Sequence, residues 1–172
     1  DRVFEKNVTS TIVLPFTINV ENVKGGKFYK FGSVREETSG YTVMKASAAP
    51  SKLYANTPYL VEMSDSKITF EGGVTFNTST APVEKLTSGK WEFVGVYSYK
   101  NFETHPELGR VYGFAGEEWN GVKIGQFTRV AGAATIMPLR AYLVKHQASK
   151  VAAYSLPSVI DVELADENDQ VI

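Results

Sequence analysis

The sequence predicts an all-β fold, a single-domain antiparallel β-sandwich or barrel-like structure of about nine to twelve short strands with little helix. Aromatic residues make up 12% of its 172 residues, and Thr, Val and Gly are plentiful, which favours strands and tight turns. Apolar and polar residues alternate repeatedly, the period of a strand with one buried face. A sandwich and a barrel share this period, so both architectures stay open.

The strands in the first half of the chain follow β-branched and aromatic runs bounded by Gly or Pro. Pro15 ends the first run, because proline has no N–H to donate to a sheet. The expected strands are residues 11–14, residues 27–34 and the segment around Tyr41 and Val43.

Two segments, residues 55–62 and 138–146, each carry a Tyr-Leu-Val run after turn-forming residues. Both predict a strand entered through a turn. The flanking residues align poorly, so a shared strand composition explains the two runs better than an internal repeat does.

Two β-hairpins are also predicted. In residues 68–76, apolar residues alternate on both sides of Gly72-Gly73, which is typical of a two-residue turn. The second hairpin turns at Asn120-Gly121, a pair that favours a type I′ turn, between strands at 111–114 and 122–130.

Residues 91–99 predict a strand buried on both faces. One face carries the large aromatic residues, and the opposite face carries Val94 and Val96. The residues expected on the aromatic face are Trp91, Phe93, Tyr97 and Tyr99.

Residues 148–156 are expected to form a turn or two of helix before Pro157. A final strand is expected after this proline, where Ile160, Val162 and Leu164 alternate with acidic residues. We therefore divide the chain into one all-β domain, residues 1–165, and an acidic tail or linker, residues 166–172. The tail lacks the glycine and the terminal glutamate of a calcium-binding loop, so a solvated tail is favoured over a calcium site.

Composition excludes several partners. The formal net charge is −1 and the 18 basic residues are scattered singly, so no basic face for nucleic acid is expected. No apolar run approaches the roughly 20 residues of a membrane span. Cysteine is absent, which excludes disulfides and thiol chemistry. The chain starts at Asp1 without a signal peptide, so we expect a processed or excised piece of a longer protein.

No catalytic residue, metal site or cofactor is predicted. The chain lacks a Gly-x-Ser-x-Gly elbow, and His105 and His146 have no carboxylate or second histidine at ligand spacing. Both histidines are expected to be structural or solvent-exposed. Glu117 and Glu118 have the composition of a glycosidase acid beside a sugar-stacking ring, but a charged turn before Asn120 is the favoured interpretation.

The best ligand-binding candidate is Trp119, which lies at an expected loop tip with polar neighbours. The more common arrangement of such a ring is to pack back over its own hairpin. An exposed indole is a flat platform for the C–H face of a sugar. Glu118, Asn120 and Arg110 are the expected polar partners of this ring. Trp91, by contrast, begins an apolar strand and is expected in the core.

The chain also resembles a family. The ordered motifs are Arg-Val-Phe at residues 2–4, Thr-Ile-Val-Leu-Pro-Phe at 11–16, Gly-Lys-Phe-Tyr-Lys-Phe at 26–31, Leu-Tyr-Ala-Asn-Thr-Pro-Tyr-Leu-Val at 53–61, Phe-Val-Gly-Val-Tyr at 93–97 and Arg-Ala-Tyr-Leu at 140–143. Over residues 2 to 165 they resemble β-rich modules, often C-terminal, of large surface proteins of Bacteroidetes and Fibrobacter-type bacteria.

The resemblance implies a secreted or cell-surface module with no established catalytic residues. We therefore expect a non-catalytic extracellular unit, a structural spacer or adhesion unit of a larger bacterial protein, whose partners are the other domains of that protein. The alternative is a carbohydrate-binding module that recognises polysaccharide through an exposed aromatic platform. Residues 101–109 and 117–119 have no counterpart in those modules, and they are the expected location of a specific ligand if the module binds one.

Overall fold

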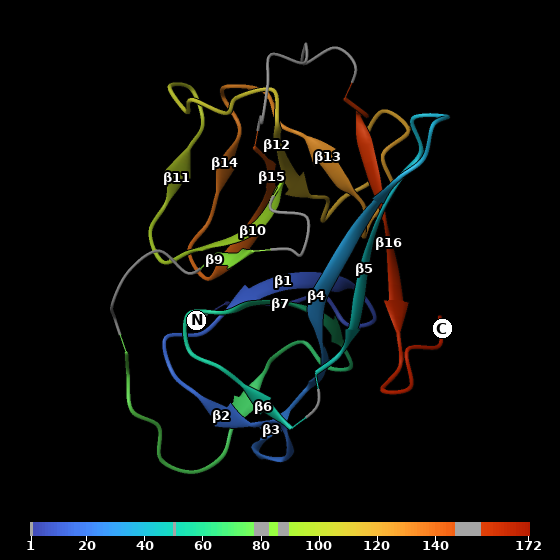
Figure 1. The fold of residues 1–172 in the computed structure, drawn as a ribbon. Helices are drawn as coiled ribbons and strands as arrows, with labels where there is room; N and C mark the ends of the chain where they lie inside the picture. The colour runs from blue at the N-terminus through green and yellow to red at the C-terminus, as the bar shows by residue number, and fades with distance from the viewer. Residues whose placement is uncertain (1, 50, 78–82, 86–89, 147–155) are drawn as a thin grey trace.

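The computed structural model describes residues 2–49, 51–77, 83–85, 90–146 and 156–172 (Figure 1). The all-β prediction is confirmed: within these ranges the chain forms sixteen strands and a single 3-10 turn, η1 (Val20–Asn22). The short helix expected at residues 148–156 lies almost wholly outside the described residues.

The ten longer strands form one sheet. Its order is β1 (Thr9–Val13), β7 (Pro58–Met63), β4 (Gly26–Glu36), β5 (Thr42–Ala48), β16 (Val159–Ala165), β13 (Phe127–Arg129), β12 (Val111–Phe114), β15 (Arg140–Lys145), β10 (Trp91–Val96) and β9 (Val83–Lys85). Three two-stranded sheets join β2 (Ile18–Asn19) to β6 (Lys52–Leu53), β3 (Val23–Lys24) to β8 (Thr69–Phe70), and β11 (Lys100–Asn101) to β14 (Thr135–Ile136).

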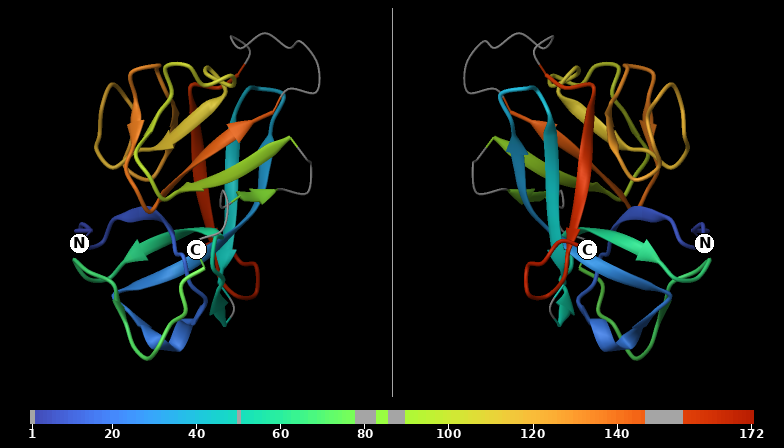
Figure 2. Two further views of the ribbon diagram at one scale, coloured as in Figure 1. Left: turned by 90° about the vertical axis from the view of Figure 1, so that its left-hand side faces the viewer. Right: turned by 90° about the vertical axis from the view of Figure 1, so that its right-hand side faces the viewer.

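One strand pairing departs from the antiparallel expectation. Strand β16 runs parallel to β5, with Val162 opposite Met44, and the two strands lie side by side in both views of Figure 2. The partners lie more than 100 residues apart in the sequence, and a parallel pair needs a long crossover connection. The described neighbours elsewhere in the sheet are antiparallel.

The large sheet curls until it is nearly closed into a barrel (Figure 1). At the closure, the edge strand β1 meets the start of β15 without a regular ladder. The Thr11 hydroxyl donates to the Ala141 carbonyl at 3.3 Å and accepts from the Ala141 N–H at 2.9 Å. The Val13 N–H donates to the Leu139 carbonyl at 3.3 Å. One buried hydroxyl thus replaces part of a ladder and satisfies two backbone groups.

Gly95 allows β1 to approach this closely. A Cβ atom at Gly95 would lie 2.8 Å from the Cβ of Val13 and 2.9 Å from each of its methyl carbons. Real side chains do not pack at such distances, so the strand β10 needs a glycine where β1 crosses it.

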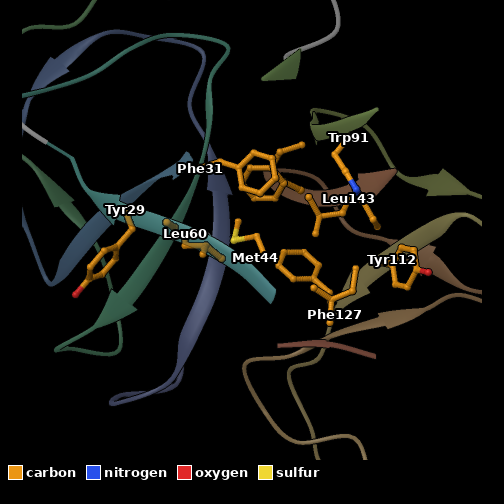
Figure 3. Packing of buried hydrophobic residues seen from close by; sticks show 12 residues of the cluster. Tyr29, Phe31, Met44, Leu60, Trp91, Tyr112, Phe127 and Leu143 are labelled. Carbon is orange, nitrogen blue, oxygen red and sulfur yellow. The ribbon is translucent and has the colours of Figure 1, made fainter. Parts of the chain in front are cut away.

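The interior of the barrel is filled by large apolar side chains (Figure 3). Trp91 is only 1% exposed, which confirms it as a core residue. The cluster takes side chains from eight strands: Tyr29, Phe31, Met44, Ala46, Leu60, Trp91, Phe93, Tyr112, Phe127, Ala141, Leu143 and Ile160.

Two further apolar clusters cover the outside of the sheet and explain the Tyr-Leu-Val runs. Both runs are strands, as predicted: the first lies in β7 and the second in β15. Leu60 and Leu143 point into the barrel interior, whereas their neighbours pack outward. Tyr59 and Val61 join the cluster beneath the β2–β6 and β3–β8 sheets, and Tyr142 and Val144 join the cluster beneath β11–β14.

The hairpin predicted at residues 68–76 is wrong. Gly72 has a φ of +90° and does turn the chain, but β8 pairs with β3 instead of with residues 74–76. The rings of Phe70 and Phe76 both form T-shaped pairs with the ring of Phe16, with centroid distances of 5.1 and 5.5 Å. Packing on this distant ring outweighs the local turn preference.

The strand predicted at residues 91–99 is shorter than expected. As β10 it has one buried face and one partly buried face, and it ends at Val96. Gly95 takes the next inward position, Tyr97 is half-buried, and Tyr99 is 61% exposed in the turn that follows. The aromatic face therefore stops where β1 crosses the strand.

The final strand is present as β16, and the residues after it fold back. Ala165 bridges Val171, and one carboxylate oxygen of Asp166 accepts the backbone N–H groups of Asn168 and Gln170, each at 2.9 Å. The Asp169 carboxylate lies 2.8 Å from the Lys45 ammonium on β5. Residues 166–172 thus form a tight turn against β16 and β5.

Candidate functional site

The Asn120-Gly121 turn presents Trp119 to solvent. Trp119 and Val122 exchange two backbone hydrogen bonds, at 3.1 and 2.8 Å, and the φ angles of Asn120 and Gly121 are +46° and +83°. Two positive φ values in this pair are those of the predicted type I′ turn. The second arm differs from the prediction, because the hairpin ladder resumes only at β13, where Phe127 pairs with Phe114.

The Trp119 ring is 68% exposed, so it does not pack back over its own turn. Val122, its partner across the turn, is buried and anchors the segment. Glu118 and Asn120 on either side are exposed, and neither side chain makes a hydrogen bond or an ion pair within the described chain. The turn therefore combines one free ring, one free carboxylate and one free amide on a rigid backbone.

Arg110, the fourth predicted site residue, does not join this group. It lies just before β12, whereas Trp119 follows the other end of the same strand. Arg110 is 8% exposed, and its Nε lies 4.0 Å from a carboxylate oxygen of Glu107. The structure thus brings Trp119, Glu118 and Asn120 together and places Arg110 in a different cluster.

That second cluster is centred on His146. Its Nε2 lies 2.7 Å from Glu92 Oε2, and its Nδ1 lies 3.7 Å from Glu107 Oε1. The Glu107 N–H donates to His105 Nδ1 at 3.1 Å. The contact between His146 and Glu92 was not predicted from the sequence, because the two residues are far apart in the chain. Glu92 lies on β10, and His146 follows the neighbouring strand β15.

His105 is held between aromatic rings at the edge of this cluster. Its ring centroid lies 5.5 Å from that of Phe102 and 6.4 Å from that of Tyr142. Burial, helped by the positive charge of Lys100, lowers the pKa of His105 below its ordinary value. Within the described residues, no three His, Asp, Glu or Cys side chains could hold a metal ion together. The cluster therefore has the arrangement of a polar network that covers the outer face of β10 and β15.

A hollow of about 610 Å³ runs beside β16, where this strand separates from β13. Polar and apolar groups alternate on its walls, among them Tyr41, Ile124, Asp161 and Ile172. Gln126 bridges part of it, since its amide donates to the Asp161 carboxylate at 2.6 Å.

In the part of the chain that the structure describes, no helix has the length and apolar character needed to cross a membrane. Searches of protein-family models, of curated proteins and of solved structures found no match to this chain.

Proposed function

We propose that this chain is a non-catalytic extracellular or cell-surface module of a larger bacterial protein, and that it adheres to polysaccharide through Trp119. The observation that carries the proposal is the 68% exposure of Trp119 at the start of a hydrogen-bonded type I′ turn. An aromatic platform of this kind suits the apolar C–H face of a sugar ring.

The neighbouring side chains add hydrogen-bonding capacity to the ring. Glu118 offers carboxylate oxygens to sugar hydroxyls, and Asn120 offers both a donor and an acceptor. The backbone bonds between Trp119 and Val122 hold the turn before any ligand arrives. Because the turn is already ordered, binding loses little conformational entropy there.

The non-catalytic part of the proposal comes from the motif resemblance, which carries no established catalytic residues. The motif resemblance over residues 2 to 165 is the basis for two further parts of the proposal: the extracellular setting, and the other domains of the same protein as partners.

The test compares polysaccharide binding by the wild-type chain, Trp119→Ala and the control Tyr99→Ala. Tyr99 is 61% exposed in a different turn, between β10 and β11. We expect saturable binding to at least one plant or host polysaccharide in affinity electrophoresis, retained by Tyr99→Ala and lost in Trp119→Ala. Urea unfolding of Trp119→Ala should stay within about 0.5 kcal/mol of wild type, as for an exposed side chain.

Tryptophan fluorescence provides an internal reference, because the only other tryptophan, Trp91, is buried. Iodide should quench the wild-type emission, and bound polysaccharide should protect it. A destabilisation of about 3 kcal/mol or more in Trp119→Ala would mean that the ring acts as core. A flat response across the polysaccharide panel would favour the structural-spacer function instead.

A further inference from the structure

Three adjoining hollows meet at Arg140, at the start of β15. Their volumes are about 220, 100 and 380 Å³, and Arg140 lines all three. Arg2 lines the first and the third. We call this region the Arg140 hollows; it lies on the edge where β1 meets β15 and does not contain Trp119.

Within the described residues, neither of the two arginines makes an ion pair with a carboxylate. Arg2 donates from Nη1 to the Leu139 carbonyl and from Nη2 to the Ser10 hydroxyl, both at 2.7 Å. Its guanidinium also lies 4.3 Å from the centre of the Phe4 ring. The side chain of Arg140 makes no hydrogen bond or ion pair with the described residues. The Nε atoms of both arginines are buried and lack a partner.

The environment disfavours two uncompensated positive charges. Burial, and then the charge of Arg140, lower the pKa of Arg2 to about 9, so the guanidinium still carries its charge at neutral pH. A buried donor without an acceptor is unfavourable, and so is a pair of like charges. An anion placed beside the two side chains would relieve the repulsion between the like charges.

The walls of the hollows identify the kind of anion. Val3, Met137, Pro138 and Leu139 line the 380 Å³ hollow, and Val3 and Met137 are exposed. Two arginine side chains beside a group of apolar side chains are typical of a small-molecule site, in which a few polar groups orient an apolar ligand. Guanidinium groups also match the planar geometry of a carboxylate.

The backbone supports the arrangement. Leu139 has a φ of +62°, an uncommon conformation for a residue with a Cβ atom. The Leu139 carbonyl accepts hydrogen bonds from both Arg2 Nη1 and the Val13 N–H. The strained residue therefore connects Arg2 to the contact between β1 and β15 that closes the barrel. Strain of this kind persists where the surrounding structure enforces it and is frequent at ligand sites.

We propose that the Arg140 hollows bind an organic carboxylate, with its charge at Arg2 and Arg140 and its apolar group against Val3 and Met137. The proposal is independent of polysaccharide binding at Trp119. A free carboxylic acid and the C-terminal residue of a peptide share this chemistry. Glu5 and Glu117 also line the 220 Å³ hollow, are exposed, and make no ion pair with either arginine. They repel a second anion and limit the site to a single carboxylate.

The test measures binding of N-acetyl-leucine, its uncharged amide and hexanoate by calorimetry and thermal shift. N-acetyl-leucine should bind and raise the melting temperature, and its amide should do neither. Equal binding of hexanoate would identify a free acid as the natural ligand type, and exclusive binding of N-acetyl-leucine would identify a chain end. Sulfate serves as the general-anion control, and a thermal shift as large as that of the carboxylates would overturn the proposed ligand class.

The variants separate a ligand site from a structural arginine. Arg140→Gln should weaken binding by roughly tenfold or more, the effect of a lost charge-assisted contact. Without ligand it should melt at an equal or higher temperature, because a repulsive charge is removed. Arg35→Gln is the matched control, since Arg35 is exposed, pairs with Glu37 at 3.5 Å and lies outside the hollows.

Glu117→Gln tests the same site without touching an arginine. It removes a negative charge from the rim and should tighten N-acetyl-leucine binding. The proposal is overturned if Arg140→Gln binds like wild type, if the acid and its amide bind equally, or if Glu117→Gln weakens binding.

Discussion

Gly95→Ala is the substitution that tests the closure of the barrel. In an ordinary strand this change stabilises, because glycine costs about 0.5–1 kcal/mol relative to alanine. At Gly95 the new methyl group would lie 2.8 Å from the Cβ of Val13, which is attached directly to the β1 backbone. The side chain of Val13 therefore cannot rotate away from it. The strands have to separate, and the closure weakens.

The magnitude follows from these opposing effects. Overpacking a filled core costs typically 1–3 kcal/mol, and three contacts below 3 Å place this site near the upper end of that range (about 3 kcal/mol). After the ordinary gain of alanine is subtracted, we expect a net loss of about 2 kcal/mol in the free energy of unfolding. For a chain of this length the melting temperature should fall by about 4–8 °C.

Urea unfolding of three variants measures the effect. Gly73→Ala is the control, because Gly73 has no positive φ and a Cβ there would meet no atom within 4 Å. Val13→Ala alone should destabilise through a cavity, but it removes two of the three close atoms at Gly95. The double variant should therefore be more stable than the sum of the single changes by about 1 kcal/mol. A neutral or stabilising Gly95→Ala would refute the close approach of β1.

Two further predictions concern buried polar groups. Thr11→Val should lower the free energy of unfolding by about 1–3 kcal/mol, because it leaves the Ala141 N–H and C=O without the Thr11 hydroxyl. Thr11→Ser keeps the hydroxyl and should lower the free energy of unfolding clearly less in the same urea titration. Equal losses in the two variants would contradict the hydrogen bond. The lowered pKa of His105 means that the unfolded chain binds a proton more readily than the folded chain, so stability should decrease as the pH falls below about 6.5. His105→Gln should remove this part of the pH dependence when unfolding is measured between pH 7.5 and 5.5, and an unchanged profile would assign it to other groups.

Local sequence signals predicted those parts of the fold that depend on neighbours in the chain. Period-two alternation identified β10 and β16, and the Tyr-Leu-Val runs identified β7 and β15. The Asn120-Gly121 pair identified the type I′ turn that carries Trp119. The same reasoning failed at residues 68–76, where the glycine pair also favoured a hairpin. There the rings of Phe70 and Phe76 pack on Phe16, a residue that no local pattern connects to them.

The candidate site divides in the same way. Trp119, Glu118 and Asn120 are adjacent in the sequence, so one turn brings them together. Arg110 was expected beside them, but β12 separates it from that turn, and it lies near Glu107 instead. The contact between His146 and Glu92 depends on the pairing of β10 with β15, which the sequence does not contain.

The all-β class, the positions of most long strands and the turn that exposes Trp119 could be predicted from the sequence, because they follow from side-chain alternation and backbone preference over a few residues. The parallel pairing of β5 with β16, the curl of the sheet into a nearly closed barrel and the approach of Arg2 to Arg140 are visible only in the folded chain. Those features join residues more than 100 positions apart. Their free energy comes from burying side chains of both partners together, and no single segment of the chain carries that information.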